Sequence, residues 1–228
     1  MTHHSQGGER RRMFVLLAVL LLLIAALTAG LLWWKLPRRP YTAAQLNIVE
    51  LSSPVDADGD GIDDWHDIME GARTYIATDP HYKSKYYAGG YPDDGCGVCT
   101  DVVWQAFRAA GYELKNLVDA DIAAHPERYG NIETSDPNID FRRVSNLDRF
   151  FTAHATVLTC NFDDPAQWQP GDIVTFGNSD HIAICSDKRR ADGIPWIIHH
   201  GNAVEEALEA DQIRRATVTG HYRWPGTP

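Results

Sequence analysis

The longest apolar stretch of the sequence covers residues 13–34, which hold 22 residues and no charge. As a helix rising about 1.5 Å per residue, this stretch is ~33 Å long, enough to cross the hydrocarbon core of a bilayer. Arginines precede it at positions 10–12, and Trp33 and Trp34 end it, as is typical of a membrane boundary. We expect a single-pass anchor that stays uncleaved. Removal as a signal peptide near Ala29 is the alternative.

The arginine cluster favours a cytoplasmic location for residues 1–12 and places the rest of the chain outside the membrane. Residues 35–50 contain two prolines and are interpreted as a linker. We expect the lipid bilayer to be one partner of this protein.

Beyond the linker, the pattern alternates between helices and strands. Apolar residues at helical spacing predict helices over residues 62–76, 99–110, 117–126 and 145–153. Apolar runs bounded by turn residues predict strands over residues 173–176, 181–185, 196–200 and 216–224. This order predicts an α+β fold in which helices pack on an antiparallel sheet.

Composition narrows the range of partners. The chain has 228 residues and a formal net charge of -10. Outside residues 10–12 and 35–39 the basic residues occur in short groups, such as 188–190, and form no basic stripe. Nucleic acid is therefore excluded as an expected partner, because its backbone phosphates need a cationic face.

Residues 56–67 have the ligand spacing of an EF-hand loop, with carboxylates at loop positions 1, 3, 5, 9 and 12 and glycine at position 6. Ile62, at position 7, is expected to offer its backbone carbonyl and to point its side chain into the core. Position 12 is Asp67 instead of the usual Glu. We assign residues 51–70 to this loop and the start of the helix after it, with a structural calcium ion as cofactor. The expected ligands are Asp56, Asp58, Asp60, Ile62, Asp64 and Asp67, and a solvated acidic turn is the alternative.

Cys99 is the candidate nucleophile. It begins the predicted helix 99–110, where unpaired N–H groups and the positive end of the helix dipole favour a thiolate over a thiol. Histidines downstream make this interpretation stronger than that of a small buried core cysteine.

His181 is the candidate general base, at the start of a predicted strand. The next strand ends in His199 and His200, whose side chains alternate to opposite faces. One of these two, or Asn202, is expected to orient His181 through its second ring nitrogen.

Tyrosines and charged residues around Cys99 are candidate substrate-binding groups. The loop before Cys99 is rich in tyrosine and glycine, and two arginines follow Asp140 at a spacing that suits a carboxylate. An internal ion-pair cluster is the alternative for the arginines. The candidate set is Tyr87, Tyr91, Asp101, Asp140, Arg142 and Arg143.

Cys96 and Cys99 have the C-x-x-C spacing of redox and zinc sites. Zinc needs four ligands, and the sequence has no second pair of cysteines or histidines at such a spacing. Cys96 and Cys99 could therefore form a redox pair. The alternative is a disulfide between Cys96 and Cys160 or Cys185 in an oxidising compartment.

Several motifs together carry a family resemblance. They are Tyr91-Pro92, residues 97–103, residues 138–147, residues 171–174, His181-Ile182 and residues 220–223. In these motifs, roughly residues 60–224 resemble the DUF1287 family, which is related to NlpC/P60 papain-like cysteine peptidases and amidases. The resemblance implies a papain-like catalytic domain over residues 60–225, with nucleophile Cys99, base His181 and third residue His199. It also implies peptidoglycan stem peptides as a substrate class, because NlpC/P60 relatives commonly cut γ-D-glutamyl or D-amino-acid bonds.

The expected function is that of a membrane-anchored, extracytoplasmic cysteine amidase or peptidase that acts on peptide or amide substrates through a thioester, without a catalytic cofactor. Two alternatives remain. One is a non-catalytic, calcium-braced domain that binds the cell wall, and the other is a thiol–disulfide oxidoreductase that uses Cys96 and Cys99.

Overall fold

A computed structural model describes residues 6–35, 39–130 and 134–225, and the chain divides into two compact units, residues 1–39 and 40–228. The first unit contains one helix, α1 (Gln6–Lys35). Its segment Arg11–Thr28 has a mean hydropathy of 2.2 and none of it is buried, so by length and composition it is able to cross a membrane as an anchor or to act as a signal sequence. Residues 1–5 of the expected tail and 36–38 of the expected linker lie outside the described residues.

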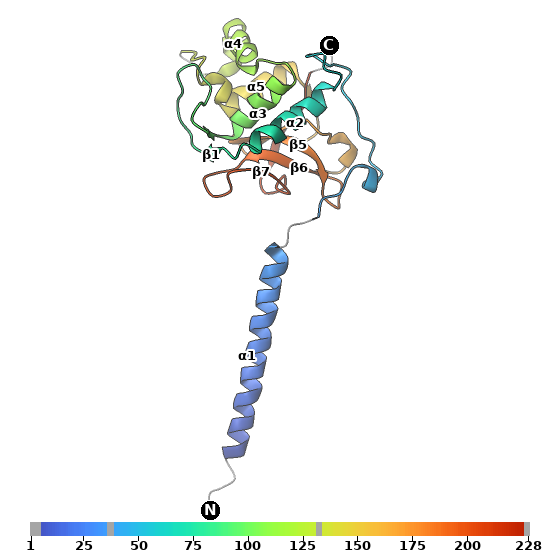
Figure 1. Ribbon diagram of the computed structural model, residues 1–228, viewed down its shortest axis with the longest axis vertical. Coiled ribbons are helices and arrows are strands. Elements are labelled where there is room, and N and C mark those ends of the chain that lie inside the picture. The colour runs from blue at the N-terminus through green and yellow to red at the C-terminus, as the bar shows by residue number, and fades with distance from the viewer. Residues whose placement is uncertain (1–5, 36–38, 131–133, 226–228) are drawn as a thin grey trace, which may run out of the picture. The chain divides into compact units, whose positions relative to one another are not determined.

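The second unit is an α+β domain (Figure 1). Its helices are α2 (Asp64–Ile76), α3 (Cys99–Ala109), α4 (Leu114–Ala124) and α5 (Val144–His154). Short 3-10 helices cover Ala44–Leu46, Pro126–Tyr129, Asp140–Arg142 and Pro165–Gln167. The four α-helices occur close to where the apolar spacing predicts them, although α4 begins about one turn earlier than expected.

An antiparallel sheet of six strands forms the second layer, in the order β3-β8-β4-β5-β6-β7. The strands are β3 (Thr156–Val157), β4 (Ile173–Phe176), β5 (His181–Arg189), β6 (Pro195–His200), β7 (Ala207–Ala210) and β8 (Val218–Arg223). A separate parallel pair, β1 (His81–Tyr82) and β2 (Cys96–Gly97), joins the loops before α3. The α+β prediction is confirmed.

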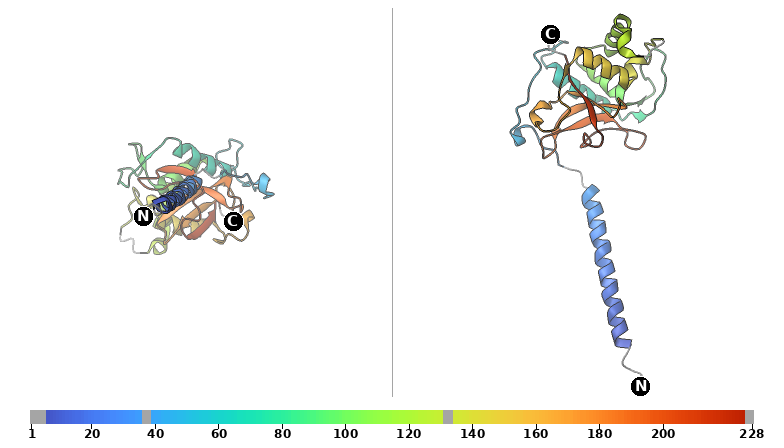
Figure 2. Two further views of the ribbon diagram at one scale, coloured as in Figure 1. Left: turned by 90° about the horizontal axis from the view of Figure 1, so that it is seen from below. Right: turned by 180° about the vertical axis from the view of Figure 1, so that it is seen from behind.

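Successive side chains of β5 point to opposite faces of the sheet, so they belong to two different apolar clusters. Ile182 and Ile184 belong to the apolar cluster that also contains the buried faces of α2, α3 and α5. Ala183 and Cys185 belong to a second cluster, which contains residues such as Trp168. The helices therefore cover one face of the sheet, as two opposite views show (Figures 1 and 2).

Two of the motifs that carry the family resemblance hydrogen-bond each other in the core. Asp172 is fully buried before β4, and its carboxylate accepts hydrogen bonds from His221 and Arg223 of β8 at 2.7–2.9 Å. Trp168 stacks on the ring of His221 at a centroid distance of 4.0 Å. The glycine-aspartate and Gly-His-Tyr-Arg motifs therefore have a structural role, in which they join neighbouring strands.

The structure corrects one detail of the acidic loop. Ile62 precedes α2, which begins at Asp64, and the Ile62 side chain is 48% exposed, so it does not point into the core. No sequence pattern predicted β7. Its residues 207–210 are all half-buried, so they do not alternate between apolar and polar positions as a typical strand does.

Candidate active site

Cys99 is the first residue of α3, and the start of this helix has no side-chain cap. The preceding residue, Val98, has extended backbone angles and offers no side-chain acceptor. Asp101 accepts the N–H of Val98 at 2.8 Å instead. The N–H groups of Cys99 and Thr100 are then left to hydrogen-bond the sulfur of Cys99.

The same sulfur also meets the strand that carries His181. The backbone N–H of Ile182, the residue directly after His181, hydrogen-bonds the thiol. Cys99 and the beginning of β5 are therefore neighbours, although they are 82 positions apart in the sequence. This contact joins the two segments through the backbone.

The resting thiol is neutral at physiological pH. Burial raises the pKa of Cys99 to about 11, and the charge of Asp101 adds to this, while the three N–H groups lower it. Desolvation disfavours the charged form more strongly than these hydrogen bonds favour it. The N–H groups at the helix start lower the pKa of Cys99 as expected, but burial raises it by more.

His181 begins β5 beside a tight turn, and its imidazole bonds another histidine. In the β4–β5 hairpin, His181 pairs with Phe176, and the two rings lie 5.8 Å apart. Nε2 of His181 lies 2.8 Å from Nδ1 of His199. Burial, and to a smaller extent the nearby His200, lowers the pKa of His181 to about 4.

Of the three residues expected to orient His181, His199 is the one that hydrogen-bonds it. Burial lowers the pKa of His199 to about 3, and His181 contributes to this shift. His200 belongs to the same strand, but its Nε2 bonds the carbonyl of Pro80 at 2.9 Å and its ring packs on Tyr82. Asn202 uses its side-chain oxygen to accept backbone N–H groups of its own turn.

Gln212 is a site residue that sequence reasoning missed. Its side chain interacts with His199 and raises the pKa of that imidazole, against the effect of burial. Gln212 is itself buried and follows β7 in a segment without apolar periodicity, so no pattern pointed to it.

A second missed residue, Asp148 of α5, fixes the turn that leads into His181. Its carboxylate accepts hydrogen bonds from Ser179 at 3.0 Å and from Thr175 and Tyr222 at 2.7 Å each. Ser179 lies two positions before His181 and has a positive φ of 62°. The three hydroxyl groups therefore connect α5, β4, β8 and the turn.

A groove of about 190 Å³ opens beside the histidine pair. His181 and His199 line it, together with charged and polar residues of the loops around β7. Arg215 and Glu205 form an ion pair at this groove. The other residues that line the groove are Phe176, Ile197, Gly201, Asn202, Gln212 and Ala216.

Two of the candidate substrate-binding residues form a buried ion pair. Arg142 donates to both carboxylate oxygens of Asp101 at 2.7 and 2.8 Å, and both side chains are almost completely buried. Asp101 also accepts from the indole of Trp104. Because all of these bonds lie within the domain, Asp101 and Arg142 position the start of α3 and do not face a ligand. The ion-pair alternative describes them correctly.

The other candidates surround this pair. Tyr87 is buried, donates its hydroxyl hydrogen to Asp94, and lies under the Arg142 guanidinium. Asp140 is buried and accepts from Ser135 and from the N–H of Asp136. These contacts exclude Tyr87 and Asp140 as free ligand-binding groups.

Tyr91 and Arg143 remain accessible. Tyr91 packs on Trp104 and donates its hydroxyl hydrogen to Glu113. Arg143 is about half exposed, with its guanidinium 3.8 Å from Asp140.

All four cysteines of the chain are free thiols in this structure. Cys185 is completely buried in the second apolar cluster, while Cys96, Cys99 and Cys160 are partly buried. A pairing of Cys96 with Cys160 or Cys185 is therefore not formed here.

The residues of the acidic loop divide into three groups. Asp56, Asp58 and Asp60 are exposed, and one carboxylate oxygen of each lies within 4.8 Å of the others. Asp64 is fully buried, and its two oxygens accept from the N–H of Ala57 and the hydroxyl of Tyr112. Asp67 is buried at the first turn of α2.

Fold and site together define an α+β domain in which a cysteine at a helix start lies near the beginning of β5, whose His181 hydrogen-bonds His199 of β6. Residues 69–224 match the family described as "Domain of unknown function (DUF1287)", and the chain belongs to this family. It is also 35% identical over 168 residues to the Escherichia coli (strain K12) protein described as "Uncharacterized protein YijF", covering 69% of this chain and 80% of that protein. No solved structure matches the chain.

Proposed function

We propose that this protein is a cysteine amidase or peptidase with a papain-like site, in which Cys99 attacks an amide carbonyl and His181 moves the proton. The observations that support the proposal are the hydrogen bond between Nε2 of His181 and Nδ1 of His199, and the closeness of the next residue, Ile182, to the sulfur of Cys99. A histidine that is oriented by a third polar residue is the arrangement that activates a nucleophile.

The hydrogen bond requires a particular distribution of protons. If His181 is to accept the thiol proton on Nδ1, its Nε2 must carry a hydrogen and donate it to Nδ1 of His199. His199 then carries its own hydrogen on Nε2, a buried nitrogen that needs an acceptor. The Gln212 side chain stabilises the protonated ring of His199, as its oxygen would do when it accepts this hydrogen.

The reaction then proceeds in two balanced halves. The thiol proton moves to Nδ1 of His181 while the sulfur bonds to the carbonyl carbon, and the imidazolium returns the proton to the amine as the C–N bond breaks. This leaves a thioester. Water attacks the thioester, its proton passes through His181 to the sulfur, and the carboxylic acid leaves.

The start of α3 supplies donors for the oxyanion. N–H groups of Cys99, Thr100 and Ile182 converge on the sulfur, so they also lie close to a carbonyl that bonds to it. Preorganised donors of this kind stabilise the negative charge that develops on the carbonyl oxygen.

The substrate class and location follow from the family resemblance and from α1. NlpC/P60 relatives support peptidoglycan stem peptides as substrates, which is an argument by analogy. The apolar helix α1 supports an anchor with the N-terminus in the cytoplasm and residues 40–228 outside the membrane.

The proposal is tested with full-length protein in detergent and purified muropeptides, with products identified by mass spectrometry. We expect cleavage of an amide bond by the wild-type protein and its loss in Cys99→Ala and His181→Ala, with unchanged melting temperatures. Cys96→Ser is the matched control and should cleave normally. Equal cleavage by wild type and Cys99→Ala rejects the proposal.

The same variants separate the alternatives. A wall-binding domain would bind muropeptides without cleaving them, in wild type and in Cys99→Ala alike. A thiol–disulfide oxidoreductase would reduce a test disulfide and would lose this activity in Cys96→Ser, whereas the hydrolase would not need Cys96.

A further inference from the structure

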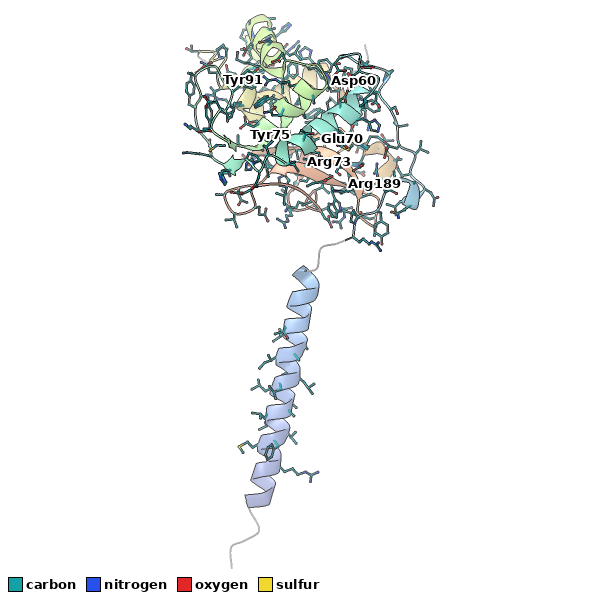
Figure 3. The ribbon with its side chains drawn as sticks, viewed as in Figure 1. Asp60, Glu70, Arg73, Tyr75, Tyr91 and Arg189 are labelled. Carbon is teal, nitrogen blue, oxygen red and sulfur yellow. The ribbon has the colours of Figure 1, made fainter. Side chains whose placement is uncertain are left out.

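The loop before α2 brings several negative charges together. Oxygens of Asp56, Asp58 and Asp60 lie within 4.8 Å of one another, a separation that suits ligands on opposite sides of one ion. In the sticks view, Asp60 lies by the end of α2 opposite to that of Tyr75 (Figure 3). Such a group alone is common on protein surfaces and does not identify a site.

A second observation comes from Asp67, on the first turn of α2. This side chain is only 9% exposed, and its Oδ2 is buried without a hydrogen-bond partner among the described residues. The charges that act on Asp67 are those of Asp60, Asp58, Asp64 and Asp56, in decreasing order. These four residues all belong to the acidic loop, so Asp67 lies beside it.

A buried carboxylate oxygen without a partner is costly, since it loses its hydration and gains nothing in return. In this place the neighbouring carboxylates of the loop increase the cost, because like charges repel one another. A cation between Asp67 and the exposed carboxylates removes both penalties at once.

We propose that residues 56–67 bind one calcium ion through the carboxylates of Asp56, Asp58, Asp60 and Asp67 and the backbone carbonyl of Ile62. Carboxylate and carbonyl oxygens in this number are the ligand set of Ca²⁺, which tolerates irregular geometry, whereas Mg²⁺ demands a near-ideal octahedron. The site lies before residues 69–224, the part that matches the family, so it is an addition to the family domain.

Asp64 is absent from this ligand set, which corrects the sequence-based expectation. Asp64 is fully buried and its oxygens accept from Ala57 and Tyr112. The carboxylates of Asp56, Asp58 and Asp60 are exposed and accept N–H groups of their own loop. Asp64 therefore ties the loop to the segment after α3, and the calcium ion would hold the other side of the loop to α2. Trp65 extends this connection by donating its indole hydrogen to the carbonyl of Trp224 near the end of the domain.

The role of the ion would be to brace the domain. Asp58 packs closely against Gly111, which ends α3 with a positive φ of 80°. Fixing the loop would therefore stabilise the end of the α2–α3 pair where α2 begins and α3 ends, and α3 carries Cys99 at its other end. This role does not depend on the hydrolase proposal.

Calcium binding is measured by isothermal titration of metal-free, full-length protein in detergent, together with its melting temperature. We expect one Ca²⁺ per chain and a rise of several degrees in melting temperature, with Mg²⁺ at least tenfold weaker. Asp60→Asn and Asp67→Asn should lose at least tenfold in affinity.

Two controls separate a ligand from a structural carboxylate. Asp64→Asn should bind calcium as wild type does, because an amide can keep the contacts to Ala57 and Tyr112. Asp93→Asn, an exposed acid in another loop, should also bind normally. If wild-type protein binds no Ca²⁺ at millimolar concentration and a chelator leaves its melting temperature unchanged, the proposal is overturned. It is equally overturned if Asp67→Asn binds like wild type.

Discussion

Nε2 of His181 and Nδ1 of His199 lie 2.8 Å apart, on neighbouring antiparallel strands. Burial lowers the pKa of both rings, so both are neutral near pH 7 and one must donate a hydrogen to the other. When His181 is the donor, its Nδ1 is left free to accept a proton.

The first prediction compares His199 with its neighbour His200. His199→Asn removes the bond that orients His181 and should lower kcat by about 100-fold, with little change in KM. His200→Asn removes a bond to Pro80 on the other face and should leave kcat within about twofold while lowering stability by about 1 kcal/mol. Hydrolysis kinetics and urea unfolding measure the two effects. Equal losses of kcat in both variants would contradict the assignment.

The second prediction concerns acid stability. The folded-state pKa values of about 4 and about 3 for His181 and His199 lie below the ordinary value of 6.5. The unfolded chain therefore binds protons first as pH falls, so stability is complete above pH 6.5 and is lost as pH falls through the folded values. Urea unfolding at pH 7.5 and 5 should show this loss.

His199→Gln provides the comparison, because it removes one of the two groups. Its stability should fall less than that of wild type between pH 7.5 and 5. An identical fall in both proteins would show that these imidazoles are not buried in neutral form.

The third prediction tests the ion pair under α3. Arg142→Ala leaves the buried carboxylate of Asp101 unpaired and should lower the free energy of unfolding by about 3–5 kcal/mol. Arg143→Ala is the matched control: its side chain is half exposed, and the loss should be about 0.5 kcal/mol or less. Urea unfolding distinguishes them. A substrate-binding role for Arg142 would instead raise KM without a large change in stability.

The fourth prediction uses the close approach of Gly97 to Tyr75. A methyl group on Gly97 would lie 2.1 Å from the Tyr75 hydroxyl, so Gly97→Ala should cost about 1–3 kcal/mol. That hydroxyl is buried without a hydrogen-bond partner in the described part of the chain, so Tyr75→Phe should cost little by itself. The double variant should recover most of the loss, as judged by melting temperature. Simple addition of the two single effects would contradict this geometry.

Sequence patterns predicted the local features of this site well. Apolar spacing placed Cys99 at a helix start, and strand alternation separated His199 from His200. Both are properties of a single element, and the period of 3.6 or 2 residues determines them.

The sequence patterns did not predict the contacts between different helices, strands and loops. Arg142 and Asp101 were candidate substrate-binding groups, with an internal ion pair as the alternative for the arginine, and they are buried against each other from segments 41 positions apart. Gln212 reaches His199 from a region with no periodicity. The effect of burial on the pKa of Cys99 was not predicted either, because it depends on how distant parts of the chain pack around the helix start.

The most direct test of the account is the chemical state of Cys99 during turnover. Wild-type protein is mixed with muropeptides, quenched in acid within the first turnovers and digested for mass spectrometry. We predict an acyl group in thioester linkage on Cys99, and its absence in Cys99→Ala, which should also be inactive. Turnover by Cys99→Ala at the wild-type rate, or an acyl group on another residue, would contradict the account.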